Sequence, residues 1–250
     1  MTRLLIIGLL FCGHISFSQK SDTSFGRPLF WYRVTDPWAM FMGAAGPPFI
    51  LYNTGNVLFL KNGKYQQIQL SDQEKEDLIS ELKLNDKFFK NTKFIDATND
   101  DTSQMKVIIT DQPSYIAYIN FDTVVRVSVY GNIRSNEFRK RFPRQILDIH
   151  DFVLNFSADQ ATDWIPDKIE VLLSDYSHSP DTPIQWPKGW PDLNNEVAKI
   201  DSGYVKSIIL DKKYLSQLNN LLKKRREKQA FEINGKKYFV GYRFPIPGLY

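Results

Sequence analysis

The chain has 250 residues, with 32 basic and 28 acidic side chains and one cysteine, Cys12. A formal net charge of +4 is too small for the concentrated cationic surface of a nucleic-acid-binding protein, and one cysteine excludes an internal disulfide. Stability must therefore come from apolar burial, and the 18 Phe, 12 Tyr and 5 Trp residues favour β-rich structure with large core side chains.

The N-terminus has the pattern of an export signal. Arg3 precedes the apolar run Leu4–Phe11, which is too short to span a bilayer, and small residues follow at Ser16 and Ser18. We expect cleavage after Ser18 and export to the periplasm or the exterior, with no transmembrane segment in the rest of the chain. A lipoprotein attached through Cys12 is the less favoured alternative, because the bulky Phe11 precedes the thiol.

Behind a flexible leader at 19–27, the pattern predicts an N-terminal α+β lobe over 28–158. A strand at 29–34 leads into a loop at 36–48 that Gly and Pro interrupt. Three strands follow at 49–52, 57–60 and 65–70, and Asn62-Gly63 predicts a tight turn between the last two. Ser71 and Glu74 form a capping box for a helix whose apolar side carries Leu78 and Leu82.

In the rest of this lobe, residues 85–103 are expected to be irregular. Strands are predicted at 105–110, 115–121 and 124–130, and a helix at 143–155. A C-terminal α+β lobe is predicted over 159–250. It begins with a strand at 168–173 and a Pro- and Trp-rich loop at 177–191. Strands at 197–200 and 204–210 follow, then a helix from Asp211 to about Lys228 and a hairpin that turns at Asn234-Gly235.

The two lobes show signs of an internal duplication. A shift of 140 positions aligns Gly63 with Gly203 and the capping residue Ser71 with Asp211. The same shift places Leu78 on Leu218, and the first strand of one lobe on the first strand of the other. We therefore expect two pseudo-symmetric antiparallel sheets, each packed by a helix, with chance coincidence of apolar positions as the competing explanation.

Few residues are candidates for catalysis or metal binding. His150 falls beside the apolar side of its helix and is interpreted as a packed histidine, whereas His178 lies in a loop with Asp181 nearby. Asp96 and Asp101 mark an acidic patch that lacks the ligand spacing of a calcium loop. No metal or cofactor is predicted, and no nucleophile elbow supports a catalytic triad.

The two long loops carry the strongest functional signal. Rigid aromatic side chains on loops are typical anchors of binding interfaces. The predicted contact residues are Trp38, Met40, Phe41, Met42, Trp186 and Trp190. The alternative is that these loops fold back over the sheets as core. If the lobes are duplicated, the two loops occupy related positions and could share one face.

Two motifs suggest a resemblance. The hairpin pattern P-x-F-x-L-Y-x-x-G-x-V starts at Pro47, and W-P pairs follow at Trp186 and Trp190. The chain thereby resembles a loosely defined group of exported bacterial proteins that share such a hairpin and a downstream W-P motif. The resemblance implies no catalytic residues.

Together these features predict an exported, non-catalytic binding protein whose partner is a protein or a glycan. One alternative is a periplasmic hydrolase of glycans or esters that uses carboxylates with His178. Another is a structural subunit of an envelope assembly.

Overall fold

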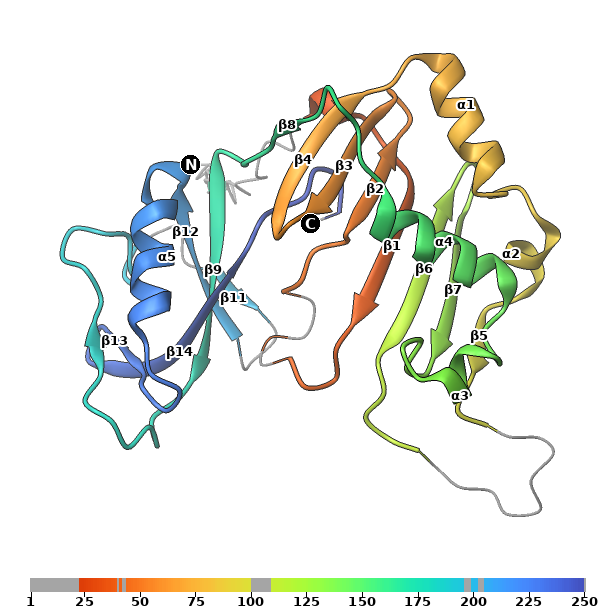
Figure 1. Cartoon of the computed structure of the whole chain (residues 1–250). Helices are drawn as coiled ribbons and strands as arrows, with labels where there is room; N and C mark the ends of the chain where they lie inside the picture. Colours follow the sequence, from red (N-terminus) through yellow and green to blue (C-terminus); the bar gives the residue numbers. More distant parts are fainter. Residues whose placement is uncertain are drawn as a thin grey trace, which may run out of the picture.

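The computed structural model describes residues 23–39, 41, 44–99, 109–195, 199–201 and 205–249. They form an α+β protein with two sheets, each of which carries helices on one face (Figure 1). Within the described residues no helix is both long and apolar enough to cross a membrane. The first lobe comprises residues 23–163, and the second comprises 168–243.

The first sheet has eight strands among the described residues, in the order β5-β7-β6-β1-β2-β3-β4-β8. All neighbours are antiparallel except β5 and β7. The strands are β1 (Pro28–Thr35), β2 (Phe49–Tyr52), β3 (Asn56–Lys61), β4 (Lys64–Gln69), β5 (Phe94–Asp96), β6 (Ser114–Asn120), β7 (Val124–Tyr130) and β8 (Thr162–Asp163).

The helices of the first lobe bury one face of this sheet in a single apolar cluster. Helix α4 lies across the sheet in Figure 1, and Ile146 and Ile149 on it are fully buried. Leu78 and Ile79 of α1 join the same cluster. The helices are α1 (Asp72–Glu81), α2 (Lys87–Asn91), α3 (Asn136–Arg139) and α4 (Arg144–Asn155), with a short 3-10 turn η1 (Thr23–Phe25) before the first strand.

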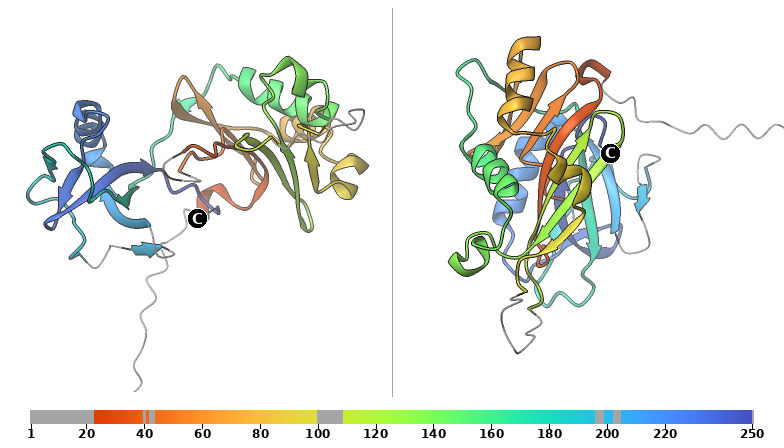
Figure 2. Two further views of the ribbon diagram at one scale, coloured as in Figure 1. Left: turned by 90° about the horizontal axis from the view of Figure 1, so that it is seen from below. Right: turned by 90° about the vertical axis from the view of Figure 1, so that its right-hand side faces the viewer.

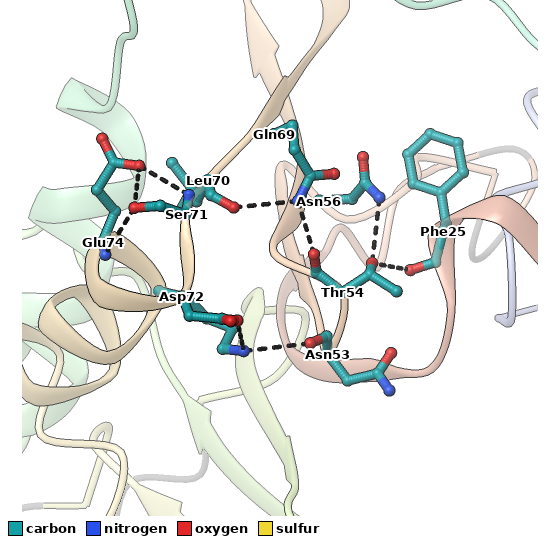
Figure 3. Close-up of polar contacts among 10 residues, drawn as sticks. Phe25, Asn53, Thr54, Asn56, Gln69, Leu70, Ser71, Asp72 and Glu74 are labelled. Carbon is teal, nitrogen blue, oxygen red and sulfur yellow. Dashed lines mark hydrogen bonds and ion pairs between the residues drawn. The ribbon is translucent and has the colours of Figure 1, made fainter.

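Local sequence signals account for the β2–β3–β4 meander and for the start of α1. Asn62 and Gly63 both have positive φ, as the predicted tight turn requires. At the helix start, the Ser71 hydroxyl accepts from the Glu74 backbone N–H, and the Glu74 carboxylate accepts from the Ser71 backbone N–H at 2.8 Å (Figure 3). The capping box and the meander are both confirmed.

The second sheet has six strands among the described residues, in the order β10-β13-β14-β9-β12-β11. Helix α5 (Leu215–Lys224), which follows the 3-10 turn η2 (Lys212–Tyr214), covers one face of it. The strands are β9 (Lys168–Asp175), β10 (Ile184–Gln185), β11 (Lys199–Asp201), β12 (Val205–Asp211), β13 (Phe231–Ile233) and β14 (Lys236–Arg243). The hairpin turn at Asn234-Gly235 is confirmed, because both residues have positive φ.

Several elements differ from the sequence expectation. The segment expected to be irregular contains α2 and β5, and the Asp86 side chain caps α2 by accepting from the Phe88 N–H at 2.7 Å. Helix α5 ends at Lys224, because Arg225 leaves the helical conformation. Phe25 belongs to the segment expected to be a flexible leader. It is instead buried, and its carbonyl accepts a hydrogen bond from the Thr54 hydroxyl. Most of the strand expected at 105–110 lies outside the described residues.

The strand orders of the two sheets do not confirm an internal duplication. The shift of 140 does superpose the bounds of β1 on those of β9 and places α1 on the start of the η2–α5 segment. In the second sheet, however, β9 pairs directly with β12, the strand before the helix. In the first sheet β2 and β3 separate β1 from β4, the strand in the corresponding position.

The end of the chain joins the two lobes. Beyond β14, the C-terminal segment (residues 244–249) crosses to the helix-free face of the first sheet, between the two sheets (Figures 1 and 2). Ile246 is 1% exposed in a cluster with Ile50 and Tyr52, and the Tyr52 hydroxyl donates to the Pro247 carbonyl at 3.0 Å. The C-terminal segment is thus a core element of the first lobe.

Candidate functional site

The 36–48 loop displays one aromatic ring and buries another. Trp38 is 77% exposed at a turn in which the Asp36 side chain accepts from the Trp38 N–H at 2.9 Å. Phe41 is 7% exposed, lies against Gly241 and contacts the Phe239 ring at 5.6 Å. Phe41 therefore ties the loop to the second lobe. The predicted contact residues Met40 and Met42 lie outside the described residues.

The tryptophans of the 177–191 loop belong to the core of the second lobe. Trp186 is 9% exposed, and its indole N–H donates to the Pro191 carbonyl at 3.0 Å. Its ring meets those of Trp190 and Phe231 edge to face, and the half-buried Trp190 ring contacts Tyr214. These rings pack on the side of the sheet that α5 covers.

The two loops do not share a face of the second sheet. Side chains alternate along a strand, and on β14 Tyr238 and Val240 belong to the cluster that contains Trp186. Phe239 and Gly241, which Phe41 contacts, point to the opposite side. The structure thus separates the predicted contact residues Phe41 and Trp186 by the thickness of the sheet.

The two histidines among the described residues lie in different surroundings, His150 buried and His178 exposed. The Tyr32 hydroxyl and His150 Nδ1 are 3.0 Å apart in the interior. Burial lowers the pKa of His150, and the charge of Asp151 opposes this shift. His178 is exposed and its ring contacts Tyr176 edge to face. The described residues contain no group of three His, Cys, Asp or Glu that could hold a metal ion.

A cleft at the junction of the two lobes is a candidate site. It encloses about 370 Å³ between the β3–β4 turn and β8 of the first lobe and α5 and β14 of the second. Four aromatic side chains line it, namely Tyr65, Trp164, Tyr242 and Phe244. Ring contacts of 5.7–6.1 Å connect Tyr65, Trp164 and Tyr242 with Phe244. We call this cavity the interlobe cleft.

The two tyrosine hydroxyls of the interlobe cleft form hydrogen bonds within the protein. The Tyr242 hydroxyl donates to Asn219 Oδ1 of α5 at 3.0 Å, and burial raises the pKa of this tyrosine. The Tyr65 hydroxyl donates to the Pro47 carbonyl at 3.0 Å. These bonds satisfy both hydroxyls and fix the positions of the two rings.

Charge in the cleft is balanced. At the rim, Lys64 and Asp163 form an exposed ion pair at 3.7 Å. Deeper, Arg243 Nε donates to Glu170 Oε2 at 2.7 Å, and both side chains of this pair are largely buried. Among the described residues that line the cleft, Asp163 is the only carboxylate. The two opposed acids that glycoside hydrolysis requires are therefore missing from this lining.

The rim of the cleft exposes apolar surface. Leu60 is 40% exposed and Ile165 is 47% exposed, and both line the opening. Sequence reasoning missed this site because its walls come from segments that are distant in the chain. The one local signal is Trp164-Ile165, a bulky apolar pair in an otherwise polar stretch between the lobes.

Comparison of the chain with protein-family models, with curated proteins and with solved structures finds no match.

Proposed function

We propose that the chain is an exported, non-catalytic binding protein that holds its ligand in the interlobe cleft. The observation that carries this proposal is a cleft whose aromatic wall comes from both lobes and whose described lining includes one carboxylate, already paired with Lys64. Ligand sites are characteristically apolar clefts with a few placed polar groups, and they recur at domain interfaces. Export is supported by the pattern of the first 18 residues.

The cleft replaces the Trp/Pro loops as the main contact surface in this proposal. Trp186 and Trp190 stabilise the second lobe, so their loss would disturb folding before it disturbed binding. Trp38 remains a candidate contact, since its ring projects into solvent from a turn that the Asp36 side chain holds. The hydrolase alternative gains no support, because the exposed His178 does not line the cleft.

The test is a ligand-observed NMR screen of small ring-containing fragments against the full chain. We expect fragments with a flat apolar face to bind, and we expect a variant with Leu60→Ser and Ile165→Ser to weaken their binding. A matched control replaces Val124 and Leu154 with serine, because these two side chains are more exposed than Leu60 and Ile165 and lie outside the cleft.

The two variants separate a local effect from a general one. Both variants should have nearly the melting temperature of the unsubstituted protein, since all four side chains are exposed. Equal binding by both variants would refute the cleft as the site. Turnover of chromogenic esters or glycosides that is lost with His178→Ala would instead establish the hydrolase.

A further inference from the structure

A second cavity lies on the first sheet, close to the interlobe cleft. It encloses about 400 Å³, and eight residues line it: Ser24, Phe25, Asn56, Gln67, Ile68, Gln69, Gln160 and Thr162. None of the eight is charged, although 24% of the chain is Asp, Glu, Lys or Arg. Four of them carry side-chain amides and two carry hydroxyls. We call this cavity the amide groove.

The amide groove and the interlobe cleft lie along the same two strands. Tyr65 of β4 lines the cleft, and Gln67 and Gln69 of the same strand line the groove. Alternate residues of a strand point to one face, so these three side chains project together at steps of roughly 7 Å. On the neighbouring strand, Thr162 lines the groove, whereas Asp163 lines the cleft.

Part of the groove is fixed in place and part is free to bind. The Gln69 amide donates to the Thr54 carbonyl at 2.6 Å and to the Leu70 carbonyl at 3.0 Å, and the Asn56 amide donates to the Thr54 hydroxyl at 3.1 Å (Figure 3). Within the described part of the chain, the amides of Gln67 and Gln160 have no hydrogen-bond partner in the protein.

The chemistry of the groove matches a chain of hydroxyl groups. An amide offers donors and an acceptor, and a sugar hydroxyl is likewise both donor and acceptor. The uncharged lining favours a neutral ligand, because it offers no counter-charge to a charged group. A peptide added to a sheet would bind its backbone along a free strand edge, whereas Gln67 and Gln69 project from the face of β4.

We propose that the amide groove is a second subsite and that the ligand is a neutral oligosaccharide that reaches from the interlobe cleft into the groove. This inference rests on the proposed function for the occupancy of the cleft. One sugar ring packs against the aromatic wall of the cleft. The hydroxyls of the following units bind Gln67 and Gln160.

The test measures affinity against ligand length by isothermal titration calorimetry of the full chain. The probes are unbranched malto-, cello- and chitooligosaccharides of two to six units. In the series that binds, affinity should rise about tenfold or more once the ligand reaches the groove, which corresponds to one or two added hydrogen bonds. A variant with Gln67→Ala and Gln160→Ala should lose this gain and keep the affinity for the short ligand.

Gln66→Ala is the matched control, because Gln66 lies on the same strand with its side chain on the opposite face. It should retain the full length dependence. An affinity independent of length, or fragment binding without any oligosaccharide binding, overturns the second subsite and leaves the proposed function standing. An unchanged affinity in the Leu60→Ser, Ile165→Ser variant refutes the cleft itself.

Discussion

The attachment of the C-terminal segment can be tested by removing one oxygen atom. Tyr52 is fully buried on β2, and its hydroxyl donates to the carbonyl of buried Pro247 at 3.0 Å. Tyr52→Phe keeps the ring and leaves that carbonyl without this donor. A buried polar group that loses its partner costs about 1–3 kcal/mol. In a chain of this size 1 kcal/mol corresponds to roughly 2–4 °C, so we expect the melting temperature to fall by about 2–12 °C.

The assay is thermal unfolding followed by circular dichroism, with amide hydrogen exchange as the local readout. The Leu249 N–H donates to the Ile246 carbonyl at 3.1 Å, so its exchange should accelerate if the segment loosens. Tyr118→Phe is the control, because the Tyr118 ring stacks on Trp31 without a hydroxyl bond within the described residues. Equal melting temperatures for the two variants would refute the reasoning.

Three further predictions concern other contacts. Because burial lowers the pKa of His150, the unfolded chain binds its proton more readily, so stability should fall as the pH drops below about 6.5 and through the folded-state pKa. His150→Gln should flatten this slope in urea titrations at several pH values. Ser71→Ala removes the cap of α1 and should cost about 0.5–2 kcal/mol, against no measurable loss for exposed Ser80→Ala. Gly241→Ala would place a Cβ 2.9 Å from the Phe41 ring and should lower the free energy of unfolding by about 1–3 kcal/mol. Adding Phe41→Leu to this variant should recover part of the lost stability.

Sequence reasoning succeeded where short-range physics decides the structure. Asn62-Gly63 gives a tight turn because both residues tolerate positive φ, and Ser71 starts a helix because Glu74 completes the capping box. The spacing of Ile146 and Ile149 placed α4 correctly. The short elements α2 and β5 were not predicted, because five and three residues are too few to show the hydrophobic periodicity of a helix or a strand.

Burial of the aromatic loops could not be settled in the same way. Trp38 and Trp186 both sit next to proline in irregular segments, and their sequence contexts look alike. They differ because the Trp186 indole N–H reaches the Pro191 carbonyl and its ring meets Phe231, contacts that exist only in the folded second lobe. The interlobe cleft has the same origin, since Tyr65 and Tyr242 come to line one cavity only after both sheets have formed.

The path of the chain end has a consequence for biosynthesis. Residues 244–249 follow the strands of both sheets in the chain, yet Ile246 completes the apolar layer over Ile50 and Tyr52. Until residues 244–249 have been made and have packed, that side of the first sheet stays uncovered and able to associate with other chains. Folding of the first lobe therefore becomes complete only after the second sheet has been synthesised, and a chain truncated before residue 244 should aggregate.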